Sequence, residues 1–289
     1  MSWETDAKYI LRMLDDFDKR LKFQERLETP VIGEFSPTDI ASILLWYDYG
    51  DYHRLFVDAG ITRVFSNSAA IYRVQDKSGN DDHANQSTSS ARPAYTQILN
   101  DLSAALFDGS SDYMIGPTNV DFSRGFSVFA VIRPTDARTE MVVSIYDSVD
   151  AGTQNRLQFY VASDGSVVCR PHQNADGGGV YIGRKSDASQ IAANLTYLLE
   201  GHYDGGALAS GIDIFLNGSE IDTTDDNNGS FSAVPATSNV PLRIGCQFSG
   251  SISVPWKGYI MDLIIFSDEI SDANKTLMRT YLNDKWGIY

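Results

Sequence analysis

The chain has 289 residues and a net charge of −15, so it is too acidic for a general nucleic-acid binder. Hydrophobic residues make up 43% of it, which excludes wholesale disorder, and its apolar runs are far shorter than the roughly 18 residues of a membrane span. The charged segment Met1–Lys8 also lacks the apolar core of a secretory signal peptide. We therefore expect a globular protein with no nucleic-acid partner and no membrane span.

The first 28 residues have the pattern of one amphipathic helix. Residues 2–28 contain neither Gly nor Pro, and apolar residues recur at alternating steps of four and three. The residues of this stripe are Trp3, Ala7, Ile10, Leu14, Phe17 and Leu21. The stripe either packs on the chain's own domain or serves oligomerisation and docking. We favour the second interpretation because residues Thr29–Pro37 resemble a linker.

From Thr38 onward, short apolar and β-branched runs alternate with clusters of Gly, Asn, Asp and Ser. Seven of these runs predict strands: Phe126–Arg133, Glu140–Tyr146, Arg156–Ala162, Leu195–Tyr203, Gly211–Leu216, Leu242–Cys246 and Gly258–Phe266. Turn signals lie between them, at Ser163–Gly165, Asn217–Gly218 and Asp225–Gly229. This alternation of strand-like runs and turns predicts a mainly β, two-sheet jelly-roll sandwich over residues 38–289. A helix over Ser271–Lys285, with Ser271 as its N-cap, is expected to pack against the sandwich.

One segment has side chains that could hold a metal ion. Oxygen-bearing residues occur at every second position, at Asp76, Ser78, Asn80 and Asp82, which suits Ca²⁺. The alternative is a tight turn held by hydrogen bonds from the Asp and Asn side chains. The four histidines are scattered, so the sequence predicts no zinc site and no other cofactor.

The sequence gives no motif for catalysis. It contains no Gly-x-Ser-x-Gly elbow, and no pair of strand carboxylates at alternating positions of the kind that sandwich glucanases use. The run Asp176–Ser186 departs from both phosphate-binding patterns by one position. We therefore expect a protein that is not an enzyme, although a glycoside hydrolase with a divergent motif stays an alternative.

Aromatic side chains in or beside predicted loops can stack on sugar rings. The candidates for glycan contact are Tyr47, Tyr49, Tyr52, Tyr181 and Trp256. The alternative for each is a place in the hydrophobic core, where most aromatic residues of a sandwich lie. The core is also where we expect the two cysteines, Cys169 and Cys246, as free thiols.

Several blocks of the sequence, in order, resemble bacterial and phage laminin-G-like jelly-roll domains of the concanavalin A-like lectin/glucanase group. The blocks are Ile43–Asp48, Val74–Asn80 with His83–Gln86, Arg92–Tyr95, Ala105–Tyr113, Phe126–Arg133, Gly258–Phe266 and Tyr281–Ile288. The chain departs from the family where Val74 and Gln75 stand in place of its usual Trp, and where the glucanase carboxylates are missing. Residues 1–37 lie outside the resemblance.

The resemblance implies a phage virion protein, because such domains occur as fibres, spikes and capsid decorations. Residues 1–37 would then attach the protein to other virion proteins or to copies of itself, for example as a trimer. The jelly-roll domain would be the exposed head, and it could contact host-surface polysaccharide. Assembly would take place in the host cytoplasm. A free carbohydrate-binding lectin is the main alternative, because the fold alone does not determine the function.

Overall fold

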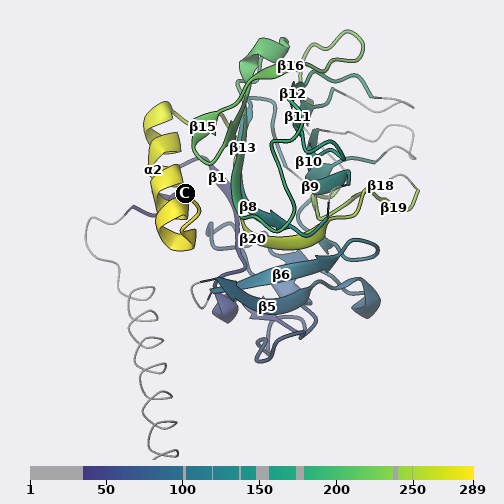
Figure 1. The fold of residues 1–289 in the computed structure, drawn as a ribbon, viewed down its shortest axis with the longest axis vertical. Helices are drawn as coiled ribbons and strands as arrows, with labels where there is room; N and C mark the ends of the chain where they lie inside the picture. The colour runs from purple at the N-terminus through teal and green to yellow at the C-terminus, as the bar shows by residue number, and fades with distance from the viewer. Residues whose placement is uncertain are drawn as a thin grey trace, which may run out of the picture. The chain divides into compact units, whose positions relative to one another are not determined.

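Two antiparallel β-sheets packed face to face make up most of the fold (Figure 1). The computed structural model describes residues 35–99, 102–118, 120–136, 138–147, 156–173, 179–236, 240–248 and 250–289. Within these residues, sheet A has the order β15 (Ser219–Glu220), β14 (Ile212–Leu216), β13 (Tyr197–Tyr203), β8 (Phe126–Pro134), β20 (Lys257–Phe266), β6 (Leu102–Asp108) and β5 (Ala94–Leu99). The strand β1 (Ile43–Asp48) pairs with the second half of β20.

Sheet B is built from shorter strands. Its order in the described residues is β16 (Thr223–Asp225), β12 (Arg184–Ser186), β11 (Val167–Pro171), β10 (Leu157–Val161), β9 (Glu140–Ile145), β17 (Arg243–Ile244), β7 (Met114–Ile115), β4 (Ala84–Asn85), β3 (Arg73–Val74) and β2 (Leu55–Phe56). A separate hairpin of β18 (Gln247–Phe248) and β19 (Ile252–Ser253) follows β17. Four 3₁₀ turns complete this part of the chain: η1 (Pro37–Asp39), η2 (Tyr52–Arg54), η3 (Ser89–Ala91) and η4 (Ala209–Gly211).

The main hydrophobic core lies between the two sheets. It includes alternate residues of β8, such as Val128 and Ala130, and alternate residues of β10, such as Leu157 and Phe159. Each strand of sheet B therefore turns its other residues to the outer face of that sheet.

The outer face of sheet A is covered by the C-terminal helix α2 (Asp272–Trp286), which lies along it in Figure 1. Ser271 caps its first turn by accepting a hydrogen bond from the backbone N–H of Asn274. Met278, Leu282 and Trp286 are buried on the helix. This second layer explains why β8 reads as a nearly continuous apolar run, since both of its faces are covered.

The structure confirms the predicted mainly β sandwich, its strands and the C-terminal helix. Cys169 and Cys246 are buried and free, as expected. The sequence did not predict the short strands β2, β3, β4 and β7, which have only two residues each. The predicted N-terminal helix, with its stripe from Trp3 to Leu21, lies outside the described residues. No helix in the described part of the chain is long and apolar enough to cross a membrane.

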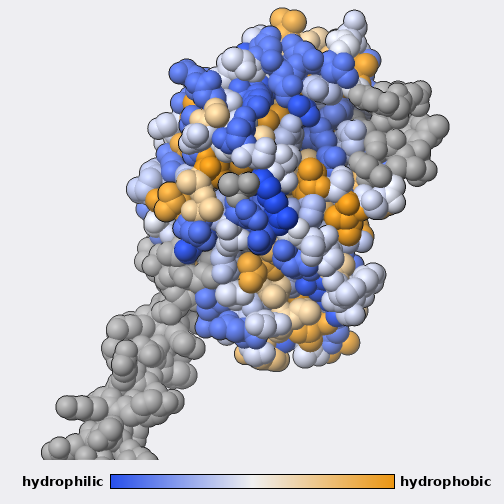
Figure 2. All heavy atoms as spheres, turned by 45° about the vertical axis from the view of Figure 1, so that its right-hand side comes forward, coloured by the Kyte–Doolittle hydropathy of each residue, from blue (hydrophilic) through white to orange (hydrophobic). Residues whose placement is uncertain are grey.

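On the side that Figure 2 presents, hydrophobic residues form small patches separated by hydrophilic ones. That distribution agrees with the acidic composition of the chain.

Candidate functional site

A buried cluster of charges joins α2 to sheet A. Asp48 of β1 lies opposite Asp262 of β20 in the strand register. Lys285 of α2 bridges the two carboxylates, with Nζ 2.5 Å from Asp48 Oδ1 and 2.6 Å from Asp262 Oδ2. Lys77 adds a second cation 2.9 Å from Asp48, and Trp46 and Trp286 donate their indole N–H groups to Asp262. Because the cluster is buried and its groups are paired, its geometry is that of a structural link.

The electrostatics of this cluster follow from its burial. Burial raises the pKa of Asp262 to about 6, against the effect of Lys285. Burial acts in the same direction on Asp48, but Lys285 and then Lys77 bring the pKa of Asp48 below its ordinary value. A substrate could reach neither carboxylate without displacing α2.

The outer face of sheet B carries a row of side chains that cross its strands in register. Paired residues of neighbouring antiparallel strands point to the same face of a sheet. Consecutive pairs link Arg243, Ile115, Asn85, Arg73, Phe56 and Arg63 in that order. The chain neighbours of these residues, such as Ile244, Val74 and Val64, belong to the core. We call this set the arginine row.

The β18–β19 hairpin closes one end of the arginine row. Gln158 of β10 donates to the Gln247 side chain, and the Arg243 guanidinium lies 4.8 Å from the centre of the Phe248 ring. Strand β9 lies between β10 and β17, so β18 crosses over the outer face of β9. Ser144 of β9 is accordingly fully buried. The row is therefore bounded at Arg243 and open at Arg63.

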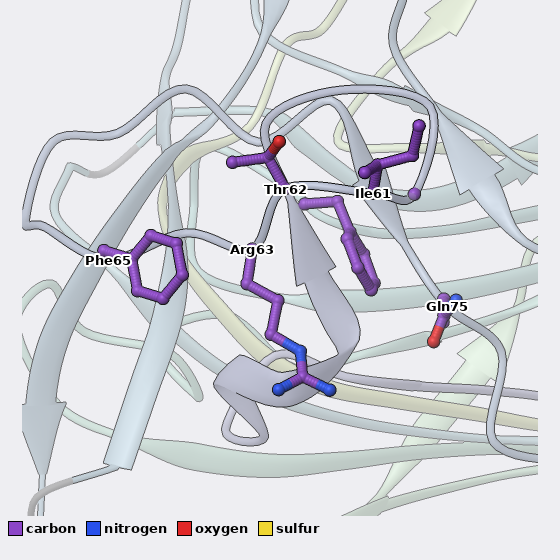
Figure 3. Close-up of a pocket in the computed structure, with 7 residues that line it drawn as sticks. Ile61, Thr62, Arg63, Phe65 and Gln75 are labelled. Atoms are coloured by element: carbon purple, nitrogen blue, oxygen red, sulfur yellow. The ribbon is translucent and has the colours of Figure 1, made fainter.

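At the open end, side chains line a pocket of about 540 Å³ (Figure 3). The lining residues are Phe56, Gly60, Ile61, Thr62, Arg63, Phe65 and Gln75. Ile61 and Phe65 are 88% and 80% exposed, which is unusual for large apolar residues. In Figure 3 the Arg63 side chain lies between the ring of Phe65 and the amide of Gln75. The pocket thus combines apolar surfaces with hydrogen-bonding groups.

The loop that carries these residues is held by local contacts. The Asp58 carboxylate accepts from the backbone N–H groups of Gly60, Ile61 and Thr62, at 2.8–3.1 Å. A hydrogen bond from the Thr62 side chain, and then these backbone hydrogen bonds, lower the pKa of Asp58 below its ordinary value. Gly60 has φ +108°, and a Cβ there would lie 2.6 Å from Nη1 of Arg73. The loop backbone therefore rests directly on the Arg73 guanidinium, which Asn85 orients by accepting from Nε at 2.7 Å.

The structure distributes the aromatic residues expected to contact glycans over different parts of the fold. Tyr49 and Trp256 lie in the core with no exposed surface, so neither offers a ring face to a sugar, and Tyr47 is buried in the same way. Tyr52 is half-buried, with its ring 4.0 Å from that of His53. Tyr181 packs on Arg170 and His172, beyond the β18–β19 hairpin.

Sequence reasoning did not single out the pocket residues Ile61, Arg63 and Phe65. The available signal was two large apolar residues in a turn-rich segment that begins with Asp58-Ala-Gly60. Large apolar residues that such a segment leaves exposed are not stabilised by burial, so they can indicate a binding site.

The segment considered for Ca²⁺ makes the hydrogen bonds of a structural turn. The Asp76 carboxylate accepts from the backbone N–H groups of Trp46, Ser78 and Asp82. The Asn80 amide donates to backbone carbonyls of β1. These bonds join the turn to β1. In the described residues, no three His, Cys, Asp or Glu side chains come together in a way that could hold a metal ion.

A protein-family model described as the concanavalin A-like lectin/glucanases superfamily matches residues 108–274. No curated protein matches the chain. Among solved structures, the binding domain of paraclostridial mosquitocidal protein 1 is similar, with a TM-score of 0.54 and 11% identity over 86% of this chain and 54% of that one.

A structure of botulinum neurotoxin type C, described as depending on two ganglioside molecules for cell entry, has a TM-score of 0.52 and 16% identity, over 86% of this chain and 53% of that one. The binding domain of botulinum neurotoxin DC in complex with rat synaptotagmin II gives 0.51 and 16%, over 86% and 52%. The chain spans about half the length of these structures. At such identities the likeness concerns the fold alone.

Proposed function

The chain belongs to the concanavalin A-like lectin/glucanases superfamily, and we propose that it is a carbohydrate-binding protein whose site is the pocket beside Arg63. The observation that carries this proposal is the exposure of Ile61 and Phe65 on a loop fixed by Asp58 and Arg73. Exposed apolar residues on a well-fixed loop are a common feature of binding sites.

The chemistry of the pocket suits a sugar. A sugar ring presents apolar C–H groups on its faces and hydroxyl groups around its edge. The Phe65 ring can cover such a face, while the Arg63 guanidinium and the Gln75 amide can hydrogen-bond to the edge. The pocket is small and open, which suits a short saccharide better than a protein surface.

We propose binding without hydrolysis. The opposed carboxylates Asp48 and Asp262 are buried under α2 and bonded to Lys285. Burial raises the pKa of Glu140 to about 7, a suitable value for a general acid, but its side chain is 1% exposed and accepts from Arg138 Nε at 2.9 Å. Release of reducing ends from a panel of bacterial polysaccharides, lost in Glu140→Gln, would instead support the hydrolase alternative.

Binding to a glycan array, followed by calorimetry on the best oligosaccharide, tests the carbohydrate proposal. We expect Phe65→Ala to weaken binding at least tenfold, because it removes the exposed ring of the pocket. Leu208→Ala is the matched control, since Leu208 is also a large exposed apolar residue but lies outside the pocket. Equal loss in both variants, or no binding to any glycan, would contradict the proposal.

For the biological setting, we propose a phage virion protein that displays this domain and touches host-surface glycans. The support is the sequence resemblance and the apolar stripe predicted for residues 2–28. Deletion of residues 2–28 is expected to abolish oligomerisation or incorporation into virions, while residues 38–289 still fold. A truncated protein that incorporates normally would refute the attachment role. A monomer that binds glycans with full affinity would favour the free lectin.

A further inference from the structure

Arg63, the charged side chain that lines the pocket, has the opposite sign to the net charge of the chain, while the Asp58 carboxylate of the same loop is bonded to the loop backbone. The protein has a net charge of −15, yet the arginine row places Arg63, Arg73 and Arg243 on one face of sheet B. Every side chain that lines the pocket is either neutral or cationic. A cationic pocket on an acidic protein favours an anionic ligand, because the rest of the surface repels such a ligand.

Arg63, which lines the pocket, and Arg73, which lies against Gly60 of its loop, differ in their partners from the ion-paired arginines of the chain. Six arginines of the described residues form ion pairs with a carboxylate: Arg54, Arg138, Arg170, Arg184, Arg243 and Arg279. For Arg63 and Arg73, no carboxylate partner is found among the described residues. Arg73 instead donates to the neutral amide of Asn85, and Arg63 lines the open pocket. The Arg63 guanidinium therefore keeps its donors available for a ligand.

The geometry of the Arg63 guanidinium narrows the chemical class of the ligand further. Its planar N–H groups match the two oxygens of a carboxylate, and such a pair is stronger than a hydrogen bond to a hydroxyl. The exposed Phe65 ring lines the same pocket, so it favours a ligand that also presents a flat apolar surface (Figure 3). A sugar ring that bears a carboxylate satisfies both requirements.

Building on the proposed function, we propose that the pocket selects acidic saccharides, with Arg63 binding the sugar carboxylate and Arg73 fixing the loop that presents Arg63 and Phe65. Arg63 is then the residue that determines specificity. Arg73 is a positioning residue, because it acts through the backbone at Gly60.

Paired probes test this assignment. Oligosaccharides of hyaluronate, alginate and polygalacturonate, and sialylated oligosaccharides, are each compared with the same oligosaccharide after chemical reduction of its carboxylates. Sulfated galactan oligosaccharides form a third arm, which separates recognition of a carboxylate from attraction of any anion. We expect the wild-type protein to bind at least one acidic member at least tenfold more tightly than its reduced counterpart, and more tightly than the sulfated probes.

Two variants complete the experiment. Arg63→Gln is expected to bring the affinity for the acidic member down to that for its reduced counterpart, with no change in melting temperature. Arg184→Gln removes the same charge from β12 at the other end of sheet B and is expected to keep the preference.

Each other outcome has a defined meaning. Equal binding of acidic and reduced probes, or a preference that survives Arg63→Gln, would overturn the acidic specificity and leave carbohydrate binding intact. Preference for the sulfated probes would replace carboxylate recognition by general anion binding. No binding to any acidic or neutral probe would overturn both this inference and the proposed function.

Discussion

The two sheets use their outer faces in opposite ways. On sheet A, α2 covers the face, and the charges beneath it are paired, as Lys285 is with Asp48 and Asp262. On sheet B, the outer face is open at the end marked by Arg63, where no carboxylate among the described residues pairs with the guanidinium. A covered charge contributes to stability only through its partners, whereas an open, unpaired charge is available to a ligand.

The comparison shows where each kind of substitution should act. Changes under α2 should lower the free energy of unfolding and leave the pocket chemistry alone. Changes in the pocket should alter binding with little effect on stability.

Removing the central cation of the covered face should have the largest effect. Lys285→Met leaves Asp48 and Asp262 opposite each other without their bridge, and we expect it to lower the free energy of unfolding by about 3–5 kcal/mol. Denaturant titration measures this change. Lys185→Met is the control, because its pair with Asp164 is exposed and should contribute less than about 1 kcal/mol. Similar losses in both variants would show that the covered cluster is not a structural link.

The pH dependence of stability should differ from that of binding. Burial raises the pKa of Asp262 to about 6 and that of Glu140 to about 7. Between the ordinary and the raised pKa values, the folded protein binds more protons than the unfolded chain, so stability falls as pH rises. Each of these two carboxyls therefore contributes more stability at pH 5.5 than at pH 8, whereas the buried His172 and His202, whose pKa values burial lowers, contribute in the opposite direction over the lower part of this range.

Glu140→Gln isolates the contribution of Glu140, so the melting temperature of this variant relative to the wild type should rise from pH 5.5 to pH 8. No Asp, Glu, His or Cys side chain lines the pocket, so affinity for an oligosaccharide should stay constant from pH 5.5 to pH 8. Affinity that follows the stability curve would contradict the separation of the two faces.

The smallest effect on stability is expected from the pocket loop. Gly60→Ala places a methyl group against the Arg73 guanidinium, so the loop should shift and binding should fall at least tenfold. The positive φ adds a strain of about 1 kcal/mol. Gly79→Ala is a close control, because Gly79 also has a positive φ but nothing lies within 4 Å of its added Cβ. The control should show the strain alone, with binding unchanged in calorimetry.

The sequence predicted what depends on continuous patterns. The apolar runs of β8 and β20 and the cap at Ser271 are local signals, and the structure contains each of them. The two-residue strands β2, β3, β4 and β7 of sheet B were not predicted, because two residues cannot show an alternation. These strands are held together by pairing between segments that are far apart in the sequence, so no single segment shows the pattern.

The residues of the pocket were not predicted, for the same reason. Phe56, Arg63 and Gln75 share a face only because β2 and β3 pair, and that register is not visible from spacing. Tyr49 and Trp256 illustrate the converse. Their turn-rich surroundings left both glycan contact and a core position open, and the sandwich buries both rings completely. Composition identifies aromatic residues, whereas topology decides which of them reach the surface.

The hairpin over β9 limits the footprint that any ligand can occupy on sheet B. Five inter-strand steps separate Arg63 from Arg243, a span of roughly 24 Å at the usual strand spacing. Beyond Arg243, the Phe248 ring packs on the guanidinium and ends the arginine row. Affinity should therefore rise with oligosaccharide length only until the ligand covers the arginine row, and then reach a plateau. A site of this kind contacts only a short stretch of a polymer, however long the polymer is.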